Sequence, residues 1–441
     1  MEKELLKKLD QLVSSGHTIC TDSRLAESGA IFFALKGPSF NGNKFALQAL
    51  EKGCIAAVVD EKITPQDERI FETIDVQDTL QQLSLFHRKQ FHIPVLGITG
   101  SNGKTTTKEL VHAVLATTFH TLATKGNLNN HIGVPLTLLD LNQAHEIAII
   151  EMGANHMGEI GELSALALPD YGIITNIGKA HLEGFGSLEN IVKTKTELYR
   201  SVMSRNGTLF INGDNPGLMK EAGDAVKVLY GRSPEQHCSG MITEESPFLS
   251  VAFQANKALG KTAEGISGTI HTRLVGAYNF ENIMAAIAIG LFFGVSPENI
   301  IRAIEGYVPS NSRSQWIDNG RNVILLDAYN ANPTSMAAAL ENFSGFGKTP
   351  KAVILGDMLE LGDVSQQEHS HIIRTLEAMN FERIILVGPE FKAIAKPSDH
   401  QLVFSNVSEA CLWLSNNQLR GYHILVKGSR GIQMEKVLEA L

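Results

Sequence analysis

Short apolar runs alternate with amphipathic segments along most of the chain. Runs rich in β-branched and aromatic residues are typical of buried strands, whereas apolar residues spaced three and four apart are typical of helices. Residues 1–93 contain two strand-like runs, 29–35 and 54–60, around a helix-like stretch that ends at Gly53. A charged, amphipathic helix pattern precedes them at the N-terminus. We therefore expect a small mixed α/β unit here.

A second unit begins at residue 94, where the apolar run "IPVLGITG" leads into the helix pattern "KTTTKELVHAVLATT". Further strand-like runs follow at 146–153 and 171–178. Strands that alternate with helices indicate a parallel, doubly wound sheet, and ligands of such sheets bind at the carboxyl ends of the strands. Glu151 and Asn176 fall at such ends. A more β-rich stretch, 206–275, and an apolar helix then complete the unit.

The remainder of the chain repeats the α/β pattern from residue 309 onward. The runs "NVILLDAY", "KAVILGD", "RIILVG" and "YHILVKGS" are each followed by a helix-like segment, which predicts a second, Rossmann-like sheet. We thus expect three α/β domains at 1–93, 94–308 and 309–441.

Composition narrows the class of protein. The 441 residues are 43% hydrophobic and 19% charged, with a net charge of −9. Clustered Lys and Arg would be needed to bind nucleic acid broadly, so that class is disfavoured. The four cysteines are widely separated, which favours incidental thiols over a zinc site or disulfides. The longest apolar run has 13 residues and no signal-peptide pattern is visible, so we expect a cytosolic protein without membrane insertion.

The stretch "GITGSNGKTTT" carries the clearest chemistry. A strand enters it and a helix leaves it, as in a phosphate-binding loop, although Ile98 stands where the general pattern has its first glycine. Backbone N–H groups near Asn102 and Gly103 could face a polyphosphate, Lys104 could reach the outer phosphates, and Thr105 or Thr106 could bind Mg²⁺. The alternative, a glycine-rich turn with a surface lysine, is disfavoured in this setting.

Five other candidates are ambiguous from the residues alone. Glu151 suits a Mg²⁺ ligand, yet a carboxylate facing solvent at a strand end is equally compatible. His181 alone is more typical of a structural histidine. Lys195 fits the charged face of a helix. Asp327 and Tyr329 fit either a ligand contact or an ordinary strand–turn–helix junction.

Taken together, the chain resembles the Mur ligases, the ATP-dependent amide-forming enzymes of peptidoglycan precursor synthesis. The resemblance rests on "GITGSNGKTTT", "EMGANHMGEI", "TNIGKAHLEGFGS", "GAYNFENIMAA" and "LLDAYNANPTSM", in the family's order. It accounts for the loop, since the family's T-G-[ST]-N-G-K-[ST] matches from Thr99 to Thr105. The stretches 124–139 and 355–363 resemble the members that add D-Ala-D-Ala to UDP-MurNAc-tripeptide.

The resemblance implies a role for each matching residue. Two Mg²⁺ ions would be bound by Thr105, Glu151, His181 and a carbamylated Lys195. ATP would be bound by Gly100, Ser101, Asn102, Gly103, Lys104, Thr105, Thr106, Asn279, Asn282, Arg313, Asp327, Tyr329 and Asn330. The catalytic residues would be Lys104, Glu151, His181, Lys195 and Arg313. Ser23 and Arg24 would contact the uridine end, and Asn127, Asn129 and Asn130 the muramoyl-peptide. Apart from the resemblance, we expect the region of Asn330 and Asp357 to contact D-Ala-D-Ala. We expect a monomer acting on these small molecules.

Two departures and three alternatives remain. Tyr278 replaces a family histidine, which weakens any role specific to imidazole near the nucleotide. Asn41 and Asn43 stand where Asp and His are usual, which weakens the inferred UDP contacts. The alternative functions are another Mur-type ligase (diaminopimelate-adding or like folylpolyglutamate synthetase), a P-loop NTPase without ligase chemistry, and a UDP-sugar-peptide binding protein.

Overall fold

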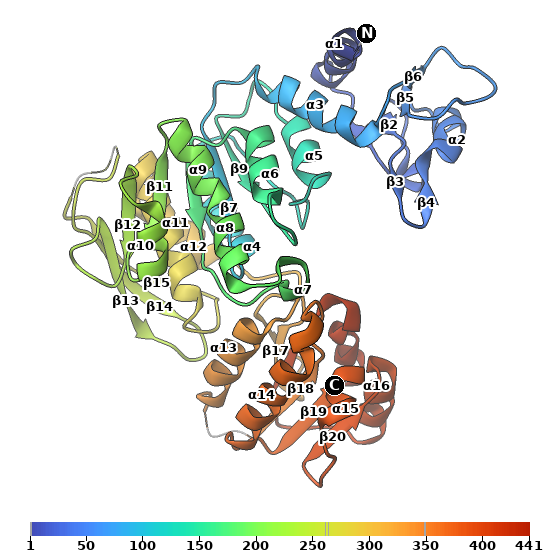
Figure 1. The fold of residues 1–441 in the computed structure, drawn as a ribbon. Helices are drawn as coiled ribbons and strands as arrows, with labels where there is room; N and C mark the ends of the chain where they lie inside the picture. The colour runs from blue at the N-terminus through green and yellow to red at the C-terminus, as the bar shows by residue number, and fades with distance from the viewer. Residues whose placement is uncertain (1, 261, 263, 348–349) are drawn as a thin grey trace.

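The computed structural model describes residues 2–260, 262, 264–347 and 350–441. The expected α/β architecture is confirmed: three main sheets are built from residues 19–72, 95–271 and 315–427. Figure 1 shows the three parts in chain order, with the central part between the other two. We propose the ranges 1–93, 94–308 and 309–441 as the corresponding domains.

The first domain has a parallel sheet of order β1-β2-β5-β6 and a two-stranded ribbon, β3-β4. Strands β2 and β5 lie in the two runs predicted as strands. The elements are α1 (Glu2–Ser14), β1 (Ile19–Cys20), β2 (Ile31–Phe33), β3 (Lys36–Gly37), β4 (Phe40–Asn41), α2 (Ala46–Glu51), β5 (Ala56–Val59), β6 (Ile70–Glu72) and α3 (Val76–Arg88).

The central sheet has nine strands in the order β15-β14-β13-β12-β11-β10-β7-β9-β8. The expected parallel sheet extends from β8 to β13, and β14 and β15 continue it in antiparallel pairing. Its strands are β7 (Val95–Thr99), β8 (Thr121–Ala123), β9 (Ile147–Glu151), β10 (Tyr171–Ile174), β11 (Thr208–Asn212), β12 (Lys227–Gly231), β13 (Cys238–Glu244), β14 (Ser250–Ala255) and β15 (Ser267–His271).

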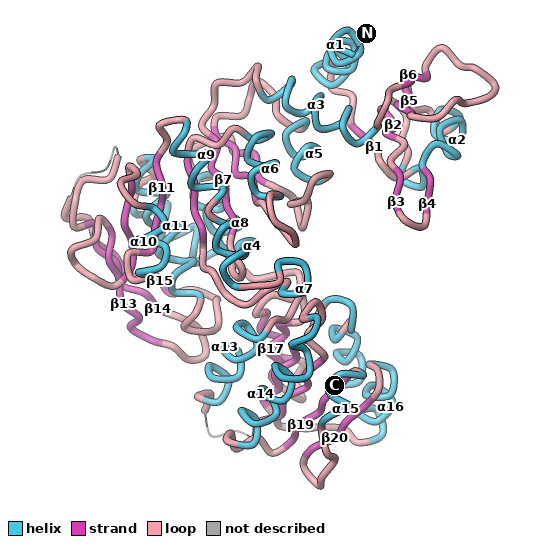
Figure 2. The backbone as a smooth tube through the Cα atoms, in the orientation of Figure 1, coloured by secondary structure: helices cyan, strands magenta, loops and turns pink. Residues whose placement is uncertain are grey.

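Helices cover both faces of this sheet, as Figure 2 shows. One apolar core lies beneath α4, α11 and α12, and a second lies beneath α5, α6, α9 and α10. The apolar helix expected after residue 278 is α11, and it is buried along most of its length. The central helices are α4 (Lys104–Leu115), α5 (Gly133–Leu139), α6 (Glu159–Ala167), α7 (Leu182–Phe185), α8 (Leu188–Lys195), α9 (Glu197–Ser204), α10 (Pro216–Ala222), α11 (Asn279–Phe293) and α12 (Pro297–Gly306).

The third domain has a six-stranded sheet of order β16-β17-β21-β18-β19-β20, parallel except for β16. The four predicted runs are β17, β18, β19 and β21, whereas the short, half-buried edge strands β16 and β20 were not predicted. The elements are β16 (Gln315–Asp318), β17 (Val323–Asp327), α13 (Pro333–Ser344), β18 (Lys351–Gly356), α14 (Ser365–Glu377), β19 (Arg383–Val387), α15 (Pro389–Ile394), β20 (Gln401–Phe404), α16 (Val407–Asn416) and β21 (His423–Lys427).

Register places the chemistry at one edge of the central sheet. Strand β7 lies between β9 and β10, with Ile98 opposite Glu151 and Thr99 opposite Ile174. The glycine loop after β7 therefore emerges beside Glu151 and beside the loop that follows β10. No helix within the described ranges is both long and apolar enough to cross a membrane.

Helix α3 ties the first domain to the central one through buried polar contacts. The ring of His87 lies 2.7 Å from the Asp10 carboxylate through Nδ1 and 2.9 Å from the Leu141 carbonyl through Nε2. Both side chains of the His87–Asp10 pair are almost completely buried. Since Asp10 belongs to α1 and Leu141 follows α5, one side chain holds segments of two domains together.

We expect His87→Ala to destabilise the protein by about 1–3 kcal/mol, because it leaves a buried carboxylate with fewer hydrogen bonds. Differential scanning calorimetry should show a lower midpoint for the transition of the first domain. His92→Ala, which removes an exposed histidine shortly after the same helix, is the control. Equal midpoints for the two variants would contradict a stabilising role for His87.

Candidate active site

A cavity of about 1100 Å³ lies at the carboxyl edge of the central sheet, and all three domains line it. Gln77 and Gln81 of α3 lie on its wall beside residues of the central and third domains. The structure brings most predicted residues together here: Ser101, Asn102, Gly103, Lys104, Thr105, Thr106, Asn127, Asn129, Asn130, Glu151, His181, Asn279, Asn282, Arg313, Asp327, Tyr329 and Asn330.

The glycine loop is held by the segment after β10. The Ser101 N–H donates to the Asn176 carbonyl, and the Asn102 N–H donates to the Asn176 side chain, both at 2.9 Å. Gly100 adopts φ +149°, and a Cβ atom there would lie 2.0 Å from the Thr175 hydroxyl oxygen. Only glycine fits so close an approach in that conformation. This contact gives a structural reason for the glycine spacing that distinguishes the loop.

The loop leads into a helix N-terminus that favours anions. Helix α4 begins at Lys104, so the N–H groups of its first turn have no partner within the helix and carry partial positive charge. The Lys104 ammonium donates to the Gly100 carbonyl at 2.7 Å and so lies over the loop. Burial lowers the pKa of Lys104, with Glu151 opposing that shift. Helix terminus and lysine together suit a polyphosphate.

Glu151 is a buried carboxylate with one oxygen left for a cation. Its side chain is nearly inaccessible, which excludes a simple solvent-facing role. Oε1 accepts from the Thr105 hydroxyl at 3.1 Å and from the Asn129 amide at 2.8 Å. Oε2 has no hydrogen-bond partner among the described residues. An unpaired buried carboxylate oxygen is costly unless a cation neutralises it, so Glu151 and Thr105 fit Mg²⁺.

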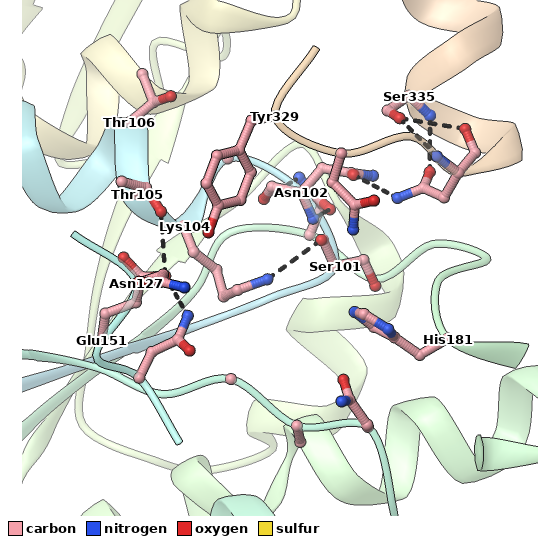
Figure 3. Close-up of a pocket in the computed structure, with 18 of the residues that line it drawn as sticks. Ser101, Asn102, Lys104, Thr105, Thr106, Asn127, Glu151, His181, Tyr329 and Ser335 are labelled. Atoms are coloured by element: carbon pink, nitrogen blue, oxygen red, sulfur yellow. Dashed lines mark hydrogen bonds between the residues drawn. The ribbon is translucent and has the colours of Figure 1, made fainter. Parts of the chain in front are cut away.

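The described residues contain no cluster of three or more His, Cys, Asp or Glu side chains able to hold a metal by themselves. A cation at Glu151 would therefore take its other ligands from hydroxyl, water and phosphate oxygens. That is the usual arrangement for Mg²⁺ bound with a nucleotide. Figure 3 shows Thr105 joined to Glu151, with Lys104 and Tyr329 extending toward the same space.

His181 and Lys195 lie farther along the central domain. His181 precedes α7, lines the cavity, and is hydrogen-bonded through Nδ1 to Glu360 of the third domain. Lys195 is the last residue of α8 and is buried, but it does not line the cavity. Burial, followed by the charge of Lys104, lowers the pKa of Lys195 to about 7, against the opposing effects of Glu159 and Glu197.

The third domain contributes a stacked cation and an ion pair whose lysine is buried. The Arg313 guanidinium lies 3.5 Å from the centre of the Tyr329 ring, and its buried Nε has no hydrogen-bond partner among the described residues. Asp327 ends β17 and lies 2.5 Å from the Lys427 ammonium, which also donates to the Asn330 carbonyl at 3.3 Å. These contacts fix the polypeptide on which Tyr329 and Asn330 face the cavity.

The start of α11 braces the glycine loop. The Thr107 hydroxyl donates to the Asn282 side-chain oxygen at 2.9 Å, and the Asn282 amide donates to Asn279 at the same distance. Tyr278, which replaces a histidine of the resembling family, is hydrogen-bonded through its hydroxyl to Ser314 of the third domain at 2.8 Å. The asparagines thus line the cavity while holding α11 against α4.

The asparagines expected near the muramoyl-peptide lie between β8 and α5. Asn127 lines the cavity, as Figure 3 shows, and Asn129 contacts Glu151. The Asn130 side chain accepts from the N–H of Gly133, the first residue of α5, at 2.9 Å. The loop therefore lies beside the proposed cation site.

Three predicted substrate residues lie outside the cavity. Ser23 and Arg24 belong to a short 3-10 turn of the first domain, where Arg24 is exposed and paired with Asp22 at 2.6 Å. Asp357 corrects our expectation of a D-Ala-D-Ala contact: it is fully buried, and its carboxylate accepts from the Glu390 and Phe391 N–H groups at 2.8 and 2.9 Å. Because both oxygens hold the start of α15, we do not retain that contact.

Residues missed from the sequence include Lys427, Glu360 and Asn332. Lys427 had a detectable signal, since a lysine at the end of the apolar run "YHILVK" is costly unless it is paired. Asn332 caps α13 and donates to the Asn102 side chain at 2.8 Å. Glu360 lies in the stretch 355–363 that carried part of the resemblance, but nothing there distinguished it, because its partner is a histidine of another domain.

Comparisons with known proteins agree with this arrangement. The family model described as "Mur ligase middle domain" matches residues 98–290, and that described as "Mur ligase, glutamate ligase domain" matches residues 312–430. A UDP-N-acetylmuramoyl-tripeptide--D-alanyl-D-alanine ligase of Bacillus subtilis (strain 168) is 36% identical over 438 residues, which cover 96% of this chain and 93% of the relative.

Two solved structures share the whole fold. MurF from Acinetobacter baumannii superposes with a TM-score of 0.86 at 32% identity, covering 98% of this chain and 97% of that one. MurF ligase from Thermotoga maritima in complex with ADP gives a TM-score of 0.84 at 27% identity, covering 97% of each chain. Together with the matching domains and the relative's near full-length similarity, they establish that this chain belongs to the Mur ligase family.

Proposed function

We propose that the protein is an ATP-dependent ligase that joins D-Ala-D-Ala to UDP-MurNAc-tripeptide, giving UDP-MurNAc-pentapeptide, ADP and phosphate. One observation supports this proposal most directly. The anion-binding loop, the unpaired Glu151 oxygen and the Arg313 side chain of the third domain all lie in a single cavity. The full-length similarity to ligases of that name supports the choice of substrates.

The reaction requires activation of a carboxylate, which is a poor electrophile in water. The terminal carboxylate of the tripeptide attacks the γ-phosphorus of ATP, the bond from that phosphorus to the bridging oxygen breaks, and ADP leaves. The amine of D-Ala-D-Ala then attacks the acyl phosphate carbon, loses a proton, and phosphate departs with the electron pair. Lys104 and Arg313 neutralise charge on the transferring phosphoryl group.

Mg²⁺ bound at Thr105 and Glu151 would supply positive charge to the phosphate oxygens. We assign a second ion to His181 and to Lys195 as a carbamate. An ammonium has only donors and repels a cation, whereas a carbamate offers oxygen ligands. Burial supports this assignment, because a lysine with a pKa of about 7 presents the neutral amine that reacts with carbon dioxide near neutral pH.

We assign the remaining contacts to residues that line the cavity, and that position supports the assignment. Asn279, Asn282, Tyr329 and Asn330 would bind the nucleotide, and Asn127, Asn129 and Asn130 would contact the muramoyl-peptide. We keep Ser23 and Arg24 at the uridine end, on the first domain, so that the substrate extends from that domain into the cavity. The protein acts as a monomer in the cytoplasm, where its nucleotide-linked substrates are available.

Other functions explain the site less completely. A simple NTPase or a UDP-sugar-peptide binding protein gives no reason for Arg313 and Asp327 of the third domain to line a nucleotide cavity. A diaminopimelate-adding ligase or a folylpolyglutamate synthetase would use similar activation chemistry, so the acceptor must be distinguished by experiment.

The identity of the acceptor can be tested by phosphate release. Phosphate release should require ATP, UDP-MurNAc-tripeptide and D-Ala-D-Ala together, because the acyl phosphate is discharged by the dipeptide amine. A coupled phosphate assay with each component omitted in turn provides the measurement. Release with a single amino acid but not with the dipeptide would exclude this acceptor, and release without any acceptor would favour an NTPase.

The role of Lys195 can be tested by substitution. We expect Lys195→Ala to lower turnover on the order of 10³-fold, since a charge-stabilising group is lost, and short carboxylic acids to restore part of it. Lys193→Ala is the matched control, because Lys193 lies on the same helix, half-exposed and paired with Glu189 at 2.8 Å. If Lys195→Ala keeps the turnover of Lys193→Ala, Lys195 has no role in the reaction.

A further inference from the structure

The contact between His181 and Glu360 joins two domains inside the cavity. Nδ1 of His181 is hydrogen-bonded to a carboxylate oxygen of Glu360, and both residues line the cavity wall. Glu360 lies on the loop that follows β18, a part of the third domain distant in sequence from the central domain. The pair therefore exists only when the third domain lies against the central one.

The backbone around the pair is arranged for this contact. His181 and Glu360 adopt φ of +52° and +63°, a left-handed conformation that is uncommon outside glycine. Such residues persist where the surrounding structure holds them and are concentrated at functional sites. The Glu183 N–H also donates to the Glu360 carbonyl at 3.2 Å, so backbone and side chain fix the same approach.

Apolar packing and an ion pair hold the two loops in place. Leu182, next to His181, packs against the cores of both the central and the third domain, and Leu361, next to Glu360, is buried in the third. Lys179 reaches across the same boundary to Glu368 at 2.7 Å. Contacts other than the His181–Glu360 pair thus support docking of the domains. The pair is therefore not required for docking itself and can act on the histidine ring.

The hydrogen bond selects one form of the histidine ring. A carboxylate accepts, so Nδ1 must donate, and the neutral ring then keeps its lone pair on Nε2. A lone pair on Nε2 is what a cation or another donor in the cavity requires. Carboxylates that fix the tautomer and orientation of a histidine in this way are common next to metal ligands.

We propose that Glu360 is a positioning residue that makes His181 competent only when the third domain is docked, an inference that rests on the ligase function proposed above. Glu360 does not touch the reacting atoms. It acts through the His181 ring, holding Nε2 toward the cavity as an acceptor. Domain docking and assembly of the reaction site are thereby coupled through one hydrogen bond.

The test reads the histidine tautomer directly by nitrogen NMR. Isotope-labelled full-length protein is saturated with a non-hydrolysable ATP analogue and UDP-MurNAc-tripeptide, without added metal, at a pH well above the ordinary histidine value of about 6.5. The His181 signal is assigned by its loss in His181→Gln. We expect the Nδ1–H form in the unmodified protein and in Glu360→Gln, whose amide oxygen still accepts, and the Nε2–H form in Glu360→Ala.

Kinetics separate positioning from docking. Glu360→Ala should lower kcat about 10–100-fold with little change in KM for ATP, and Glu360→Gln should lower it less. Glu368→Gln is the matched control, because it removes the neighbouring interdomain ion pair without touching His181, and it should keep both kcat and the Nδ1–H form. An unchanged tautomer in Glu360→Ala, an Nε2–H ring in the unmodified protein, or equal losses of kcat in Glu360→Ala and Glu368→Gln would each overturn the proposal. The tautomer is independent of turnover, so it remains informative even if D-Ala-D-Ala proves not to be the acceptor.

Discussion

The approach of Gly100 to the end of β10 is the constraint on which the site depends. Because the glycine has no Cβ, the loop backbone lies directly against Thr175, and Asn176 holds the next two N–H groups. That contact fixes where α4 begins and therefore where its N-terminal N–H groups and Lys104 lie. The carboxyl ends of β7, β9 and β10 then bring the loop, Glu151 and the segment leading to His181 to one edge. A side chain at position 100 would displace all of them at once.

The site also depends on charged and polar groups that are buried. Lys195 is buried, and the charge of Lys104, which lines the cavity, adds to the effect of burial in lowering the pKa of Lys195. Glu151 and Arg313 each keep a buried polar atom without a partner among the described residues. Such atoms are expensive in a protein that binds nothing. Their cost is offset if phosphate oxygens and cations bind to them. The same groups that lower the stability of the free protein then stabilise the charge of the transferring phosphoryl group when the ligands are bound.

Sequence patterns predicted the fold well because burial is expressed locally. Apolar runs identified the central strands, and the uniformly apolar residues of α11 identified a helix buried on all sides. Motifs identified the loop, Glu151 and most of the cavity wall. What they missed depends on tertiary contacts: the edge strands β16 and β20 carry too few buried residues, and Glu360 acquires its partner only through docking of two domains. The sequence pattern at Asp357 was ambiguous for another reason. A polar residue after an apolar strand can hold the start of a neighbouring helix as readily as it can bind a ligand.

Contacts between the central and the third domain determine what each contributes to the site. The glycine loop alone could bind a nucleotide, but the Asn102 side chain of that loop accepts a hydrogen bond from Asn332, and Tyr278 beside α11 contacts Ser314, so the third domain is joined to the loop and to its brace. A nucleotide bound there would lie between the central and the third domain. It could favour the docked arrangement of these domains only through contacts that it makes in that arrangement alone. Arg313 is such a contact, because it belongs to the third domain and faces the cavity. The reactive carboxylate is thus activated in a space that exists only when both domains enclose it, which limits loss of the acyl phosphate to water.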